Sequence, residues 1–425
     1  MFESIVAIAR WALCLVSPVV TLRFLRWLPV WIPFLPVAGT WVMELGIERE
    51  FYFLQSYLEF GVILALLAWW SARGKSRTSL RLFGLPLLAL PAMVLARDHF
   101  WHSAFLMFLL VGGGAVYQYF YEGMDYAIRR RVITWAALTW TSLGCMIKLY
   151  DAFLLGGIIL YQRGGSIWGS NHVGGILFLL LPLVRSKWVS ALALVYLLLN
   201  FSRGIYVGLI VYAVAWILWV DPRRAIRIIG TIAAAILMLL LLLPSGMTKP
   251  IADFAVERIA YQSFDMRDVT VASILDRALS DKRLEIFDAA LVVAKRSHWV
   301  GVGPGGFYWA LEEAGIPMGY SNAHNLYLTA LAEGGILYTL AFVLLLASLL
   351  MRAYRVDRRV FAGLVSWCVY GLFSGQLYEA TRFVTAGDYY CLLLVFAYVA
   401  WKAEHGDPAR RGRGARRGTP SVKAT

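Results

Sequence analysis

The sequence has 425 residues, of which 60% are hydrophobic, and it carries a formal net charge of +14. Its mean hydropathy of +0.66 exceeds that of soluble domains, in which roughly half of the residues are apolar. Runs such as "GVILALLAWW", "TIAAAILMLLLLL" and "LYTLAFVLLLASLL" are too long and too uncharged for soluble helices. We therefore expect an all-α polytopic membrane protein with about 12 transmembrane helices.

The positive charge does not indicate nucleic acid, because the basic residues gather in short loops between apolar runs. Such loops face the cytoplasm in membrane proteins. The tail "ARRGRGARRG" is expected to be disordered, cytoplasmic and close to anionic lipid. The loop residues are Arg73, Lys75, Arg77 and Arg81; Arg129, Arg130 and Arg131; Arg185 and Lys187; Arg223, Arg224 and Arg227; and Arg352, Arg355, Arg358 and Arg359.

The first apolar run has no basic n-region and no cleavage site, so we expect a retained span rather than a signal peptide. Residues 1–45 fit two spans or one span and a half-helix, which gives 12 or 13 crossings, and 12 is favoured. Residues 82–96 and 100–120 are expected to form a hairpin with an outer turn at 97–99. The segments expected to cross the membrane after it are 133–148, 172–184, 188–201, 204–220, 226–243, 323–351, 360–373 and 389–401.

A long segment of mixed charge, residues 244–322, has no apolar run long enough to span. Long external domains translocate largely regardless of charge, so the segment is expected in the periplasm. Its helical period predicts an amphipathic lid on the membrane surface, with an apolar stripe formed by Leu275, Leu279, Leu284, Phe287 and Leu291. This divides the chain into membrane helices (1–243), a periplasmic segment (244–322), membrane helices (323–402) and a tail (403–425).

Four cysteines lie in apolar runs without metal-ligand spacing, so we expect small core side chains, no zinc site and no disulfide framework. No cofactor and no metal ligand is predicted. The cysteines are Cys14, Cys145, Cys368 and Cys391.

His324 stands at the start of the apolar run in "SNAHNLYLTALAEGGILY". Asn322 is the expected N-cap, which would place His324 near the second helical position. There the helix dipole disfavours imidazolium, so a neutral imidazole could accept a proton, and the same helix N-terminus attracts phosphates. The alternative is a histidine that simply sits half in lipid and half in water.

Two arginines are the other main candidates. Arg203, in "NFSRG", joins two spans at the outer surface, where short loops usually avoid arginine. Its planar guanidinium could grip a phosphate, or it could be a snorkelling anchor. Arg283 lies in the external segment beside Asp281, Glu285 and Asp288, so an exposed salt bridge is its alternative role.

Further polar positions are weaker candidates. Glu333 follows His324 by nine residues and points to the opposite helix face, so it is expected to be a structural acid. The stretch "GVGPGGF", residues 301–307, lacks the Lys-Ser/Thr of a P-loop and is interpreted as a tight turn. "GSNHVGG" places Asn171 and His172 at another outer helix start.

These motifs together resemble the O-antigen ligase superfamily. The resemblance rests on "SRG" between two spans, on "RLEIFDAALVVAKRSHWVGVGPGGF" and on "HNLYLTALAEGGILY". It implies a GT-C-like, metal-independent glycosyltransferase that takes O-antigen from undecaprenyl diphosphate and transfers it to a sugar hydroxyl of lipid A–core. Arg203 and Arg283 match the diphosphate-binding arginines of the family, and His324 matches its proposed general base. Asn325, His172 and Lys148 are candidates for substrate binding.

Other functions remain open at this stage. An O-antigen polymerase or a protein O-oligosaccharyltransferase of the same superfamily would use the same residue types. A metal-dependent GT-C transferase would place acidic residues in an outer loop, where Glu48 and Glu50 lie, but the external segment contains no Asp-x-Asp. A transporter of lipid-linked sugars is the non-enzyme alternative, although it would place its charges near the bilayer midplane rather than at the outer rim.

Overall fold

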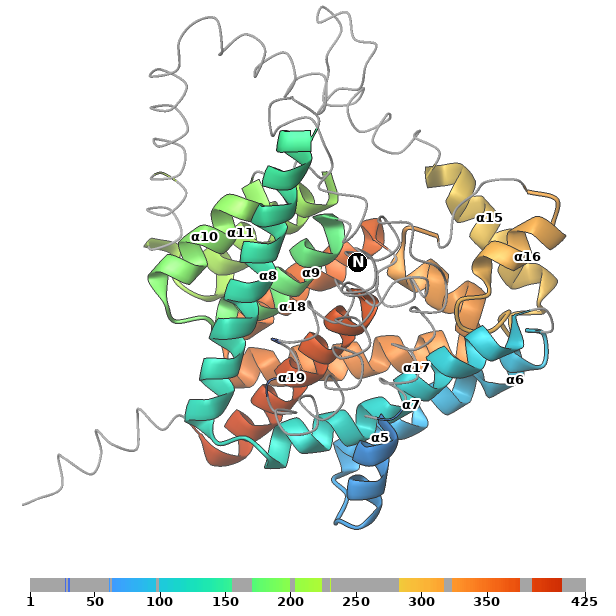
Figure 1. The fold of residues 1–425 in the computed structure, drawn as a ribbon, viewed down its shortest axis with the longest axis horizontal. Coiled ribbons are helices and arrows are strands. Elements are labelled where there is room, and N and C mark those ends of the chain that lie inside the picture. Colours follow the sequence, from blue (N-terminus) through green and yellow to red (C-terminus); the bar gives the residue numbers. More distant parts are fainter. Residues whose placement is uncertain are drawn as a thin grey trace, which may run out of the picture.

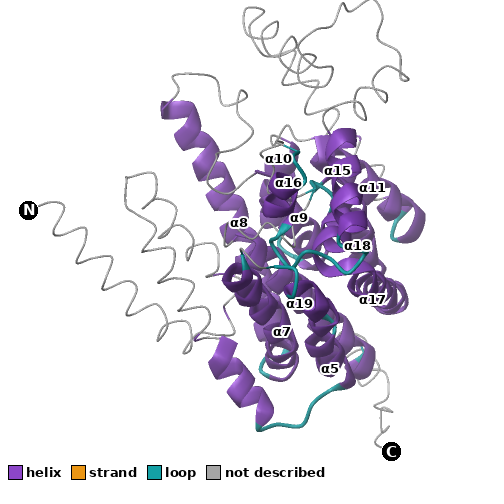
Figure 2. Ribbon diagram, turned by 90° about the vertical axis from the view of Figure 1, so that its right-hand side faces the viewer, coloured by secondary structure: helices purple, strands orange, loops and turns teal. Residues whose placement is uncertain are grey.

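The computed structural model describes residues 27, 30, 61, 63–96, 99–154, 170–198, 203–223, 230, 283–316, 323–374 and 384–406. Within these ranges every regular element is a helix, as Figure 2 shows. The helices are α5 (Arg77–Gly84), η2 (Pro86–Ala89), α6 (Leu90–Met93), α7 (Phe100–Glu122), α8 (Tyr126–Leu154), α9 (Ser170–Leu180), η3 (Leu181–Leu183), α10 (Lys187–Leu198), α11 (Arg203–Trp219), α15 (Arg283–Arg296), α16 (Phe307–Glu313), α17 (Leu326–Val356), α18 (Arg358–Tyr370), η5 (Gly371–Phe373) and α19 (Val384–His405).

The predicted continuous arm 82–96 is wrong, because the chain is divided there into α5, η2 and α6. Pro86 opens η2 and Pro91 stands in the first turn of α6. A proline ring clashes with the preceding turn and offers no N–H group, so a helix cannot pass through both positions undisturbed. The second arm of the expected hairpin is confirmed as α7.

The centre of the bundle is built by α9, α17, α18 and α19. α19 packs against α7, α9 and α17, while α18 packs against α9, α11 and α17. In Figure 1, α8, α10 and α11 lie to one side of these helices, and α15 and α16 to the other. A side chain at Gly363 of α18 would meet Pro182 at 2.3 Å, so the missing Cβ lets α18 approach η3 closely.

One end of the bundle collects several of the basic loops, and we call it the basic end. The ring of Tyr126 stacks on Trp401 at 5.3 Å, and Arg185 donates to the Tyr126 hydroxyl at 2.8 Å. Arg129 lies over the Trp401 ring at 5.2 Å. The starts of α8 and α10 therefore meet the end of α19, which agrees with loops that share one side of a membrane.

α15 confirms a helix within residues 244–322, and the membrane contact of its apolar stripe stays a prediction. Leu284 is 47% exposed, whereas Ile286, Ala290 and Val293 are buried. Leu275 and Leu279 lie outside the described residues. Small and branched side chains face α16 and α17 because they allow closer packing than a leucine stripe would.

The described residues include one helix that is both long and apolar enough to cross a membrane, Leu326–Val356. Shorter apolar helices cover Val173–Leu183, Lys187–Leu198 and Gly204–Trp219. The total of about 12 spans stays a prediction, and the expected spans within residues 1–45 and 231–243 lie outside the described residues.

Candidate functional site

The start of α17 differs from the prediction that Asn322 caps this helix. The N-cap is Asn325, whose side-chain oxygen accepts from the backbone N–H groups of Tyr327 at 3.0 Å and Leu328 at 3.1 Å. Asparagine satisfies these otherwise unpaired donors well. His324 therefore lies just before the helix rather than in its first turn. Two N–H groups at this helix N-terminus are already hydrogen-bonded to Asn325. They are therefore not available to the anion that was expected to bind there.

His324 adopts a left-handed backbone conformation, with φ of +48°. Histidine is among the few non-glycine residues that tolerate this region, and such residues cluster at functional sites. The side chain is half-buried. The left-handed backbone of His324 directs the chain into α17.

Both neighbours of His324 are held firmly. Ala323 is fully buried, and its N–H donates to the hydroxyl of Thr329 at 3.2 Å. Asn325 is fixed by its own capping bonds. The backbone on either side of the left-handed residue is thus anchored to the first turn of α17.

The first residue of α11 is Arg203, and packing brings this helix start to the same end as His324. A Cβ at Gly204 would lie 3.1 Å from Phe373 and 3.3 Å from Tyr370. A Cβ at Gly371 would in turn meet Leu326 at 3.1 Å. The end of α18 therefore bridges the starts of α11 and α17. The Arg203 side chain lies outside the described part of the structure.

Arg283 is the first residue of α15, and its side chain is likewise not described. Ile286, less than one turn further on, belongs to a buried cluster that also contains Ala323. The starts of α15 and α17 thus share one small core. The starts of α11 and α15, where Arg203 and Arg283 stand, both pack close to the start of α17. The contacts of the two guanidinium groups stay predictions.

A glycine-rich loop, Trp299–Gly306, packs directly on α17. The N–H groups of Val302 and Gly303 donate to the carbonyls of Ala332 and Glu333, each at 3.0 Å, and Ile336 donates to Trp299 at 2.9 Å. The helical backbone of α17 is interrupted at Gly335, where φ is +80° and ψ is +177°, and the interruption accommodates these bonds. That region is essentially restricted to glycine.

Glu333 locks the same loop with its side chain. Its carboxylate accepts from the N–H of Gly305 at 2.8 Å and from that of Phe307 at 3.4 Å, and the residue is 0% exposed. The prediction of a structural acid is confirmed. The interpretation of "GVGPGGF" as a tight turn is also confirmed, because Gly301, Gly303 and Gly305 all have positive φ.

The start of α7 holds the loop from its other face. His99 donates from Nε2 to the carbonyl of Val302 at 3.0 Å, and Ser103 donates to that of Pro304 at 2.7 Å. The His99 ring stacks on Trp309 at 4.8 Å. Sequence reasoning missed these contacts, because about 200 residues separate the partners and no local pattern links them.

Two minor candidates have described backbones only. Lys148 lies towards the C-terminal end of α8, and His172 lies in the first turn of α9. Both positions are remote from the basic end, since α8 begins and η3 finishes there. Their predicted substrate contacts, like that of Asn325, stay predictions.

The described part is thus all-helical, with one helix of membrane-spanning length that begins shortly after His324. This arrangement agrees with the expected class of helical membrane proteins. Residues 188–343 match a family model described as O-antigen ligase, and this match places that segment in the O-antigen ligase superfamily. Members of this family are glycosyltransferase-like enzymes associated with membranes. No curated protein matches the chain significantly.

The matched segment contains Arg203, Arg283, His324 and Asn325, whereas Lys148 and His172 precede it. It also contains both partners of the loop contact, Trp299–Gly306 and Ala332–Ile336. The resemblance inferred from the sequence is therefore confirmed at the level of the superfamily.

Proposed function

We propose that this protein is an O-antigen ligase. It would transfer O-antigen polysaccharide from undecaprenyl diphosphate to a sugar hydroxyl of lipid A–core on the periplasmic face of the inner membrane. The observation that carries the proposal is the family match over residues 188–343, which includes all three predicted catalytic positions. The packing of the starts of α11 and α15 towards the start of α17 supports it.

The proposed step requires no metal and no nucleotide. His324 accepts the proton of the acceptor hydroxyl, whose oxygen forms a bond to the anomeric carbon of the donor sugar. The bond between that carbon and the phosphate oxygen breaks, and its electron pair leaves with undecaprenyl diphosphate. Arg203 and Arg283 neutralise the charge that develops on the diphosphate.

The geometry at His324 suits a general base. The residue directly precedes α17, and its half-buried position leaves part of its surface accessible to an acceptor. A base of this kind contributes roughly 10² to 10⁴ in rate. Asn325, His172 and Lys148 are proposed to contact donor or acceptor sugars.

The proposed topology is GT-C-like with about 12 spans, a periplasmic segment over 244–322 and a cytoplasmic basic tail. The gathering of Arg129, Arg185 and Lys402 at the basic end supports it. The candidate site lies at the other end of the helices, which corresponds to the periplasmic face when the basic end is cytoplasmic.

The test is complementation of a Gram-negative strain that lacks its O-antigen ligase and has a matching core. Wild type is expected to restore the high-molecular-weight ladder of lipopolysaccharide. His324→Asn, Arg283→Gln and Arg203→Gln are expected to abolish it at equal expression. Asparagine is chosen at position 324 because it also tolerates a left-handed backbone.

Arg296→Gln is the matched control, because Arg296 is an exposed arginine in the last turn of the same helix as Arg283. It should leave the ladder intact. A ladder restored by all variants would refute the catalytic site but not the activity. Failure of wild type here, with rescue of a polymerase-deficient strain, would assign the protein as an O-antigen polymerase. Glycosylation of a periplasmic protein instead would indicate a protein O-oligosaccharyltransferase.

A further inference from the structure

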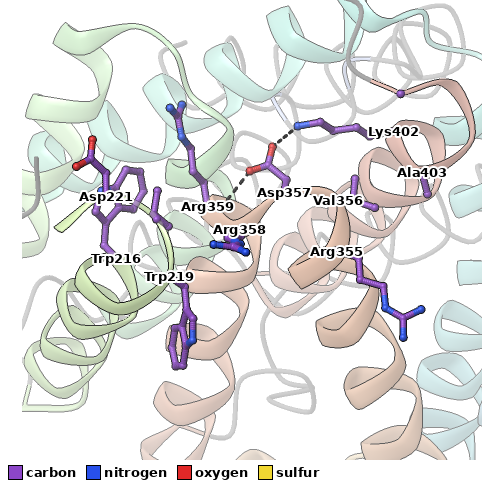
Figure 3. Close-up of a pocket in the computed structure, with 12 residues that line it drawn as sticks. Trp216, Trp219, Asp221, Arg355, Val356, Asp357, Arg358, Arg359, Lys402 and Ala403 are labelled. Carbon is purple, nitrogen blue, oxygen red and sulfur yellow. Dashed lines mark hydrogen bonds and ion pairs between the residues drawn. The ribbon is translucent and has the colours of Figure 1, made fainter. Parts of the chain in front are cut away.

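A pocket of about 600 Å³ opens at the basic end, remote from the candidate active site. Figure 3 shows its lining residues. They come from the end of α11, the junction of α17 and α18, and the end of α19. The lining comprises Trp216, Trp219, Val220, Asp221, Arg355, Val356, Asp357, Arg358, Arg359, Lys402, Ala403 and Gly406.

The pocket has an excess of positive charge. Four cationic side chains face two carboxylates, which leaves two positive charges in excess. Asp357 is engaged, because it accepts from Lys402 at 2.5 Å, from Tyr398 at 3.2 Å and from the N–H of Arg359 at 3.1 Å. Asp357 therefore neutralises Lys402 and caps α18, rather than compensating the arginines.

The arginines contact aromatic rings instead of described carboxylates. Arg359 lies over Trp216 at 5.9 Å, and Arg358 lies over Tyr354 at 5.5 Å. In Figure 3, Arg358 lies between Trp219 and Arg355, while Arg355 points away from the Asp357–Lys402 pair. The pocket thus combines guanidinium groups with tryptophans, the residues that favour the membrane–water boundary.

Two exposed apolar stripes lead along the helices to this pocket. On α11 the stripe consists of Ile210, Val214 and Leu218, which follow one another at intervals of four residues. On α17 it consists of Leu337, Leu340, Leu344 and Met351. Both stripes end within a turn or two of pocket residues, Trp219 on α11 and Arg355 on α17. A ligand with a charged head and apolar chains matches both the pocket and the stripes.

We propose that this pocket binds the phosphate head group of an anionic phospholipid, with its acyl chains along the exposed faces of α11 and α17. Arg358 and Arg359 grip the phosphate, because guanidinium groups donate two parallel hydrogen bonds to it. Arg355 adds a positive charge at the rim. The site is separate from the glycosyl-transfer site and does not depend on the function proposed there.

The experiment is native mass spectrometry of the delipidated full-length protein in detergent. Phosphatidylglycerol and phosphatidylcholine with identical acyl chains are titrated separately. Wild type is expected to prefer phosphatidylglycerol about tenfold, because the excess positive charge of the pocket attracts its anionic head group more than the zwitterionic head group of phosphatidylcholine. Arg358→Gln combined with Arg359→Gln is expected to remove this preference. The Asp357 cap survives in that variant, since it uses the backbone of residue 359.

The matched control is Arg77→Gln combined with Arg81→Gln, which removes the same charge from exposed positions of α5. It should retain the preference of wild type. Equal loss in both double variants, or no loss in either, would refute a specific site in favour of general surface charge. Inorganic phosphate at equal concentration should not displace the lipid. Displacement by phosphate alone would show a free-anion site and overturn the lipid assignment.

Discussion

The carboxylate of Glu333 accepts a hydrogen bond from the backbone N–H of Gly305 at 2.8 Å, and both groups are buried. This contact joins α17 to a loop that precedes it by almost thirty residues. The loop is held at the same time by His99 and Ser103 of the α7 region. The loop is therefore held from two sides, by Glu333 of α17 and by His99 and Ser103.

We expect Glu333→Leu to destabilise the protein by about 2–4 kcal/mol, because two buried N–H groups lose their acceptor. Glu333→Gln keeps one acceptor oxygen and should cost less. The measurement is thermal unfolding of the purified protein in detergent. Glu313→Gln, at an exposed position of α16, is the control and should unfold as wild type does. Wild-type stability of Glu333→Leu would contradict the locking role.

Gly335→Ala should also destabilise strongly. Its φ and ψ lie where only glycine is comfortable, and an added Cβ would lie 2.1 Å from the carbonyl oxygen of Val300. A loss of about 3 kcal/mol or more is expected from strain and displacement of the loop together. Gly315→Ala separates the two causes, since its φ is +71° with no atom within 4 Å of the added carbon. It should cost only about 1–2 kcal/mol, and equal losses at both positions would contradict the clash.

Asn325→Ala should cost about 1 kcal/mol of stability, because the capping bonds to Tyr327 and Leu328 are lost. Asn325→Asp caps a helix equally well and should restore stability. The decisive comparison is thermal unfolding against ladder formation for both variants. Restored stability with restored activity means that Asn325 acts through the cap. Restored stability without activity means that its amide contacts the substrate.

Asp357 both caps α18 and pairs with Lys402, and two substitutions can separate the contributions of these contacts to stability. Asp357→Asn keeps a capping oxygen but leaves the largely buried Lys402 without its anionic partner, at a cost of about 1–2 kcal/mol. Asp357→Ala loses both and should cost about 1 kcal/mol more. Thermal unfolding measures both, with Asp288→Asn on the exposed face of α15 as the control. Identical losses for both Asp357 variants would show that the cap contributes nothing.

Several helices and the candidate site residues could be proposed from local sequence patterns alone. Apolar runs predicted helices close to α7, α10, α11, α18 and α19, because burial in lipid or protein demands long uncharged segments. Arg203 and His324 were recognised because each stands at the edge of an apolar run, and Arg283 because it lies in the stretch "RLEIFDAALVVAKRSHWVGVGPGGF" that carries the family resemblance. These signals lie within a few residues of the chain, so they require no knowledge of packing.

Local patterns failed where packing competed with them. The leucine stripe of α15 gave no sign of its second face, on which Ile286 and the alanines pack in the cluster shared with α16 and α17. Asn322 and Asn325 were equally suitable caps by residue type. The structure uses Asn325, because the left-handed backbone of His324 interrupts a helix that would begin earlier.

Consecutive residues were sufficient to indicate a helical membrane protein, the family resemblance of residues 188–343 and the polar positions worth testing, because hydrophobic runs and motif spacing lie within short stretches of the chain. Only the tertiary structure decided the left-handed turn at His324, the break at Gly335 and the contacts of Glu333 and His99 with one loop. The physical reason is that buried backbone groups must find partners wherever packing places them. Here those partners are supplied by segments up to about 200 residues away.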